Sequence, residues 1–174
     1  MPASLWRRYI PGEKIKGRFQ QEDWPRIFYG IDNDNQLADF AVANPETVTL
    51  LLLGPGRKGR EVGIVMLLLT DSRRRQLSLH GGAWTDTLSA RLLMYRGLYL
   101  LFNKLFEEGY RLCSSSVDNP QAVRFMKSFG FRINSYRRGR TSYYLTSELL
   151  ARAETVNKVI NRYKQQNSIS AMRN

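Results

Sequence analysis

The sequence has only one cysteine, Cys113, and only one histidine, His80. A single cysteine cannot form a disulfide within the chain, which fits a reducing compartment. The sequence also has no cysteine–histidine set and no acidic cluster with metal-ligand spacing, so no metal site is expected. No further histidine is present to form a nucleophilic pair with Cys113, so we interpret this cysteine as a buried small residue of an apolar strand.

Long uninterrupted apolar runs are also absent. The N-terminal stretch MPASLWRRYIPGEK contains none, so we expect no signal peptide. The most apolar segment, 88–106, carries Arg91, Arg96 and Lys104. Charged side chains inside such a segment predict a buried helix and not a membrane span.

Acidic residues are few, with 15 Asp and Glu against 27 Lys and Arg and a formal net charge of +12. A protein this basic is expected to associate with an anion such as nucleic acid, a phosphorylated cofactor or an acidic protein surface. The alternative is that the charge only keeps a solvated surface soluble. The length of 174 residues and the 43% hydrophobic content indicate one globular domain.

Three short apolar runs, 48–53, 62–69 and 76–80, are joined by the turn-rich segments GPGRKGRE and TDSRRR. Short β-prone runs separated by turn residues predict an antiparallel meander. The region before them is harder to interpret, and only short helical pieces at 20–24 and 36–43 are suggested.

The period of the apolar residues changes at Leu88, where a helix with a wide apolar face begins. Asp86, Thr87 or Ser89 is a candidate for its N-cap, and Gly109 lies where a helix-ending glycine belongs. The segment 111–117 then predicts a fourth strand.

The next stretch, DNPQAVRFMKSFGF, predicts a second helix. Asn119 is suited to cap it, Pro120 to occupy its first position and Gly130 to end it. Its apolar face consists of Ala122, Phe125, Met126 and Phe129. The segments FRINSYRR and TSYYLT then predict a hairpin that turns at Gly139.

The segment 146–166 predicts a last amphipathic helix. Its apolar residues alternate at spacings of four and three: Leu149, Ala153, Val156, Ile160 and Tyr163. This seam either docks on its own domain or pairs with a partner helix or a second copy of the chain. We therefore divide the chain into a domain over 1–145 and a C-terminal amphipathic helix and tail over 146–174.

This order of elements and the spacing from Asn119 to Ala122, Phe125, Gly130 and Phe131 resemble the GNAT superfamily of acetyl-CoA-dependent N-acyltransferases. The resemblance implies an α/β (α+β) fold: a mixed central sheet made of an antiparallel meander and a β-α-β-α-β hairpin, with helices on both faces. The run from Val48 to Phe131 more narrowly resembles GNAT-like proteins of short-tailed bacteriophages, described as internal virion proteins or acetyltransferases.

The resemblance implies acetyl transfer from acetyl-CoA to an amine in a bacterial host cytoplasm, or a catalytically silent adaptor of a virion. In the first case His80 is the expected general base and Tyr136 a second catalytic residue. The resemblance places the cofactor near Leu79, Leu88, Ser89, Ala90, Arg91, Asn119, Ala122 and Phe125.

Two features depart from the GNAT pattern. Gly81 and Gly82 come too early for the glycine-rich pyrophosphate turn, and Asp86 stands where it would repel phosphate. The amides of 88–91 either bind phosphate or are used in capping. In addition, Met126 stands where many GNATs have a tyrosine that protonates the thiolate, and methionine donates no proton. We interpret Met126 as core, with Tyr136, Tyr143 and Tyr144 as candidate substitutes.

Four basic groups stand out, and three of them lie in expected turns. They are 7–8, 57–60, 73–75 and 137–140. If one end of the sheet gathers them, they would contact nucleic acid non-specifically, with Tyr136, Tyr143 and Tyr144 offering stacking faces. Such binding is expected to weaken with salt.

Overall fold

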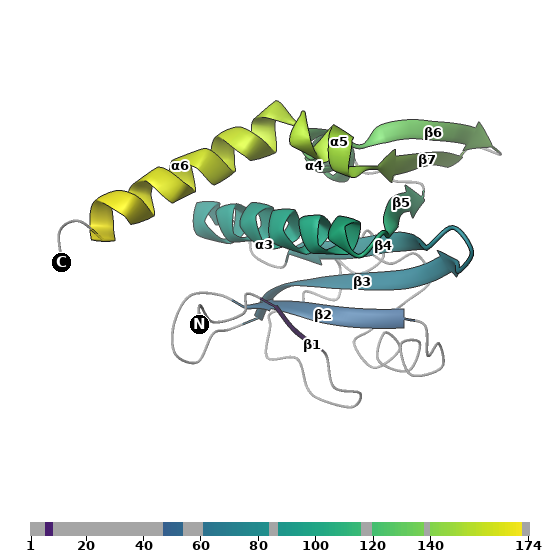
Figure 1. Cartoon of the computed structure of the whole chain (residues 1–174), viewed down its shortest axis with the longest axis horizontal. Helices are drawn as coiled ribbons and strands as arrows, with labels where there is room; N and C mark the ends of the chain where they lie inside the picture. The colour runs from purple at the N-terminus through teal and green to yellow at the C-terminus, as the bar shows by residue number, and fades with distance from the viewer. Residues whose placement is uncertain are drawn as a thin grey trace.

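The fold is that of a computed structural model, which describes residues 6–8, 47–53, 61–83, 87–115, 120–137 and 140–171. Its strands are β1 (Trp6–Arg8), β2 (Thr47–Leu53), β3 (Glu61–Asp71), β4 (Gln76–Ala83), β5 (Arg111–Ser115), β6 (Arg132–Arg137) and β7 (Arg140–Leu145). They form one sheet in the order β1-β2-β3-β4-β5-β7-β6 (Figure 1).

The meander predicted from the three apolar runs is confirmed, because β2, β3 and β4 pair antiparallel in sequence order. The expected end of the third strand at His80 is wrong. Gly81 and Gly82 continue β4 and pair with Val65 and Ile64 of the long strand β3. They are therefore sheet residues and not part of the connection to the next helix. The pairing of β1 with β2 adds a strand that the sequence did not predict.

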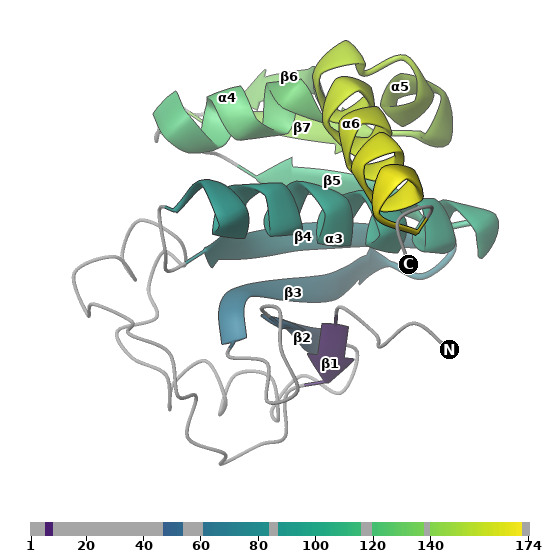
Figure 2. The ribbon, with the colours of Figure 1, turned by 90° about the vertical axis from the view of Figure 1, so that its left-hand side faces the viewer.

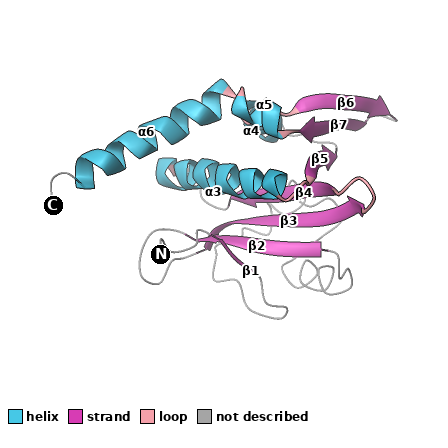
Figure 3. Cartoon of the chain, viewed as in Figure 1, coloured by secondary structure: helices cyan, strands magenta, loops and turns pink. Residues whose placement is uncertain are grey.

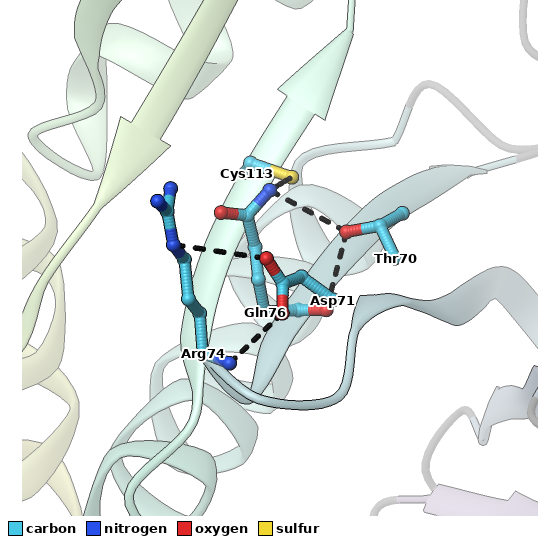
Figure 4. A network of polar contacts seen from close by, with 5 residues as sticks. All are labelled: Thr70, Asp71, Arg74, Gln76 and Cys113. Carbon is cyan, nitrogen blue, oxygen red and sulfur yellow. Dashed lines mark hydrogen bonds and ion pairs between the residues drawn. The ribbon is translucent and has the colours of Figure 1, made fainter.

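Polar contacts hold the turn between β3 and β4 and tie it to β5 (Figure 4). Asp71 Oδ1 accepts a hydrogen bond from the Arg74 amide at 2.9 Å. Gln76 Nε2 donates to Thr70 Oγ1 at 3.4 Å and to Cys113 Sγ at 3.3 Å. Cys113 is half-buried and accepts a hydrogen bond, so it is not the fully buried apolar residue that we expected. The network joins β3, β4 and β5 where their pairing begins.

The described helices are α3 (Leu88–Glu107), α4 (Pro120–Ser128), α5 (Ser147–Ala151) and α6 (Glu154–Ala171). All four lie on one face of the sheet (Figure 2). The helical pieces expected at 20–24 and 36–43 fall outside the described residues. Over the described parts of the chain, no helix is both long and apolar enough to span a membrane.

The ends of α3 and α4 follow the predicted signals. Thr87 is the residue that caps α3, since its side chain accepts a hydrogen bond from the Ala90 amide at 3.2 Å. Gly109 and Gly130 follow α3 and α4 with φ of +82° and +88°, a conformation that glycine adopts without strain. The predicted cap of α4, Asn119, lies outside the described residues.

The core lies between the sheet and the helices. From the sheet, Val65, Leu67, Leu77, Leu112 and Leu145 are buried. From the helices, the ring of Tyr95 stacks on Phe129 with centroids 5.2 Å apart, and Phe102 meets Phe129 edge to face at 5.4 Å. Met126 is 7% exposed and belongs to this core, which confirms that it packs in the interior.

The prediction of one helix over 146–166 is wrong, because a break at Arg152 and Ala153 separates α5 from α6 (Figure 3). The side-chain amide of Asn157 donates to the carbonyl oxygens of Leu150 and Ala151 at 3.3 and 2.9 Å. It thereby satisfies carbonyl groups that the end of α5 leaves without a helical partner. The seam residues Ala153, Val156 and Ile160 are buried in the same core as the preceding domain.

Candidate active site

The parallel strands β4 and β5 pair over only three residues. Their register runs Gln76–Arg111, Leu77–Leu112 and Ser78–Cys113. β5 then continues beside β7, with Ser114 opposite Tyr143 and Ser115 opposite Ser142. The described residues 79–83 of β4 have no partner on β5, so the two strands separate after Ser78. We call this feature the β4–β5 split.

The helices α3 and α4 both begin at the edge of the sheet where the split opens (Figure 2). This placement follows from the topology, since α3 follows β4, α4 follows β5, and the two strands are parallel. The N-terminus of a helix carries partial positive charge and amides without a helical partner. Two such ends beside one split create a region that favours an anion.

The first turn of α3 uses some of its amides internally. The Ala90 amide donates to Thr87 Oγ1, and the Arg91 amide donates to the Thr87 carbonyl oxygen at 3.0 Å. The amides of Leu88 and Ser89 have no partner in the part of the chain that the structure describes. Both residues are exposed, and the first turn contains no acidic side chain. The amides of Ala90 and Arg91 are therefore used by the cap residue Thr87. The amides of Leu88 and Ser89 are those suited to bind phosphate.

Two further predicted cofactor residues, Ala122 and Phe125, lie on α4. The ring of Phe125 contacts Tyr95 edge to face at a centroid distance of 5.1 Å. Ala122, one turn earlier on α4, is half-buried. Both residues belong to the predicted motif, which also includes Asn119. Asn119 lies outside the described residues.

Of the remaining predicted residues, two lie where the strands separate. Leu79 directly follows the last β4–β5 pair and is half-buried against the core. His80 is the next residue of β4. Its backbone pairs with Met66 of β3, the strand on the side of β4 away from β5. The structure therefore places the only histidine on the part of β4 that has separated from β5.

The tyrosines of the hairpin are farther away. Tyr136 lies on the edge strand β6 and is 71% exposed. Because β7 lies between β6 and β5, the structure does not place Tyr136 beside the β4–β5 split. Tyr143 is buried in the core, and Tyr144 is 38% exposed on the opposite side of β7.

One contact between α3 and α4 was missed in the sequence. The Tyr95 hydroxyl and Ser128 Oγ are 2.8 Å apart, and Ser128 Oγ also donates to the Phe125 carbonyl oxygen at 2.5 Å. This contact fixes α4 against α3 and so positions the two helix starts relative to each other. The only sequence signal was a tyrosine at an apolar position of the predicted helix, which the periodicity alone could not separate from ordinary packing.

Compared by sequence, the chain matches no protein family and no curated protein at a significant level. Compared by structure, it is similar to a GCN5-related N-acetyltransferase from Brucella melitensis, with a TM-score of 0.58 and 15% identity over 80% of this chain and 72% of that one. It is also similar to the aminoglycoside 6'-acetyltransferase type Ii, with a TM-score of 0.54 and 12% identity over 72% and 86%.

A third solved structure is a chimera of spermidine N-acetyltransferase SpeG from Vibrio cholerae and hSSAT. Its TM-score is 0.54, with 12% identity over 84% of this chain and 99% of that one. At such low identity a structural likeness establishes the fold and not the activity. The mixed sheet with its β4–β5 split and the two helices that begin beside it therefore give this chain the GNAT fold.

Proposed function

We propose that the chain is an acetyl-CoA-dependent N-acyltransferase, which transfers an acetyl group to an amine by direct attack. The observation that carries this proposal is the end of β4–β5 pairing after Ser78 and Cys113, at the edge where α3 and α4 begin. A split between parallel strands exposes main-chain groups of β4 to a ligand, while the helix starts supply amides for its phosphates.

The described residues fit such a ligand. The amides of Leu88 and Ser89 would bind the pyrophosphate, aided by the dipole of a 20-residue helix without acidic residues in its first turn. Bound acetyl-CoA supplies the thioester carbonyl carbon that the amine attacks. His80 would remove the proton that the amine nitrogen releases as the new C–N bond forms and the C–S bond breaks. Tyr136 remains the predicted proton donor to the thiolate, although its place on β6 would require the acceptor or a water to bridge the distance.

Binding and turnover are tested separately. Acetyl-CoA at about a hundred times its dissociation constant should stabilise the fold by about 2.7 kcal/mol. For a domain of this size, that corresponds to a rise in Tm of about 5–10 °C. Release of free thiol is then followed with spermidine and with an aminoglycoside as acceptors, because structural relatives act on these amines. If millimolar acetyl-CoA and CoA leave the Tm unchanged, the proposal is wrong.

A second candidate is a protein that keeps the fold and has lost the chemistry. The burial of Met126 in the core favours it, because Met126 occupies the position where many GNATs have their tyrosine. Such a protein would act as a structural or adaptor component, including the bacteriophage virion component that the narrower resemblance implies. It would bind a protein partner through the exposed side of 146–166. Its signature is a complex that is lost on removal of α6 and no thiol release with any amine.

A further inference from the structure

Arginines gather at the closed end of the sheet, opposite the edge where the β4–β5 split opens. The turn between β3 and β4 contributes Arg73, Arg74 and Arg75, all exposed. Arg111 begins β5, and its amide donates to the carbonyl oxygen of Arg75 at 2.9 Å. Arg132 begins β6, which runs parallel to β5 because both pair antiparallel with β7. We call these five arginines the arginine patch.

Part of the patch lies on the face of the sheet away from the described helices. Leu112 and Leu145 pair with each other and are buried in the core beneath the helices. Because side chains alternate along a strand, Arg111 and Tyr144 point to the opposite face. Tyr144 is paired with Arg132 on β6 and with Cys113 on β5. Its ring therefore lies level with Arg132, and two residues along the sheet from Arg111, on one sheet surface.

The described residues neutralise little of this charge. Asp71 lies 3.7 Å from Arg74, and both side chains are substantially exposed. Among the described residues, no carboxylate forms an ion pair with the other four arginines. The other acids close along the chain are Glu107 and Glu108 at the end of α3, near which Arg75 lies, and Glu148 in the first turn of α5. The sheet surface around Tyr144 therefore keeps a positive potential.

Arg75 adds an independent sign that this turn is not merely a connection. It has φ of +50° and is the one non-glycine residue with positive φ in the described segments. Glycine or asparagine would occupy such a position with less strain. The strained backbone carries an arginine whose guanidinium lies 4.7 Å from the centroid of the Tyr110 ring. Strained positions of this kind are concentrated at functional sites.

We propose that the arginine patch and Tyr144 bind single-stranded nucleic acid without reading its sequence. Planar guanidinium groups bind phosphate in a bidentate geometry, and several of them along one surface can follow a phosphate backbone. An accessible aromatic ring on a flat sheet gives an unpaired base a stacking surface. A duplex, whose bases are already stacked, would gain nothing from Tyr144. This site is separate from the proposed acyl-CoA site and does not depend on it.

The test is fluorescence anisotropy of a labelled oligothymidylate titrated with the full chain at several salt concentrations. Four phosphate contacts predict that affinity falls roughly fiftyfold between about 50 and about 200 mM salt, because each contact contributes a slope of about 0.7. The double variant Arg73→Ala/Arg75→Gly removes two charges and relieves the strained position. Its fall over the same salt range should be only about sevenfold.

The matched control is Arg152→Ala/Arg162→Ala, which removes one exposed arginine at the break between α5 and α6 and one on α6 and lowers the net charge equally. It should bind like the unaltered chain. If the two double variants lose the same affinity, binding reflects net charge alone and the site is overturned. Tyr144→Leu removes the aromatic ring but keeps an apolar side chain, and it should weaken binding roughly fivefold or more.

Two competitors identify the ligand. Unlabelled single strand should displace the probe more effectively than a duplex of the same sequence at equal phosphate concentration. Equal competition by the duplex, together with an unaffected Tyr144→Leu variant, would overturn the assignment to single strands. Equal competition by polyglutamate would show a surface for acidic protein and overturn the assignment to nucleic acid.

Discussion

The backbone at Gly130 packs directly on the carbonyl group of Leu149: a β-carbon at position 130 would lie 2.6 Å from that oxygen. It would also lie 3.2 Å from the β-carbon of Ala153. Gly130 therefore has two roles. Its positive φ ends α4, and its lack of a side chain lets the junction of α5 and α6 approach.

Gly130→Ala should destabilise the fold by about 3 kcal/mol, from the strained φ together with a clash against backbone. The measurement is urea unfolding. Gly109→Ala is the matched control, because Gly109 has nearly the same φ and a β-carbon there would meet only Arg75 Nε at 3.9 Å. The control should lose only about 1 kcal/mol. Equal losses would show that the close approach to Leu149 contributes nothing.

Asn157→Ala should cost about 1 kcal/mol, because the Ala151 carbonyl group loses the Asn157 donor and the Leu150 carbonyl group keeps the Ala153 amide without it. Asn161→Ala makes the same chemical change at an exposed position of the same helix. It should be neutral or slightly stabilising, since alanine is the better helix former. Thermal unfolding of both variants measures these changes in stability. If both variants lose the same stability, the Asn157 side-chain amide has no specific role.

Ser89→Glu separates the stability of α3 from binding at its N-terminus. A carboxylate in the first turn should stabilise the helix by about 0.3–1 kcal/mol through the helix dipole. The same charge beside a bound phosphate should weaken acetyl-CoA binding by about 1–2 kcal/mol. A raised Tm without ligand together with a smaller shift with acetyl-CoA is therefore expected.

Ser147→Glu is the control for this change, because Ser147 occupies the exposed first turn of α5, which follows the closed end of β7. It should leave the response to acetyl-CoA unaltered. If Ser89→Glu also leaves that response intact, then the start of α3 does not bind the pyrophosphate.

His80→Gln should lower kcat by about 10²–10⁴-fold if His80 removes the proton from the attacking amine. Acetyl-CoA should still raise the Tm of the variant by the same amount, because the residue acts on the acceptor and not on the cofactor. The rate of thiol release under saturating acceptor measures the first effect. An unchanged kcat would show that His80 is not the general base and that another group removes the proton.

Local signals predicted the helix ends well. Thr87, Gly109 and Gly130 act on neighbouring backbone groups, so their effect can be inferred from the sequence around them. The length of β4 could not be inferred in this way, because Gly81 and Gly82 extend the strand only by pairing with β3. The break before Glu154 was missed for a related reason: it depends on the distant Gly130 and on the side chain of Asn157.

In the candidate site, too, some features could be predicted from the sequence and others could not. The structure places His80 on the part of β4 beyond the last β5 pair, and the role of His80 stays a prediction. The order of elements could indicate that β4 and β5 are parallel, but not where their pairing ends. It did not place Tyr136, because the hairpin folds back with β7 next to β5 and leaves β6 at the edge. Lateral strand order within a hairpin depends on which strand covers the core, and neither RINSYR nor RTSYYL shows a strict apolar–polar alternation that would identify that strand.

The short ladder between β4 and β5 has a mechanical consequence. Among the described residues, three residue pairs and the hydrogen bond from Gln76 to Cys113 join the meander to the three-stranded unit of β5, β7 and β6 within the sheet. The helices also connect these two parts on one face of the sheet, where Tyr95 of α3 contacts Phe125, Phe129 and Ser128 of α4. Phe102 of α3 adds contacts with Phe129 and Phe131. Aromatic packing between α3 and α4 therefore limits how far β4 and β5 can separate. Weakening that packing would allow the two parts of the sheet to rotate relative to each other about Gln76.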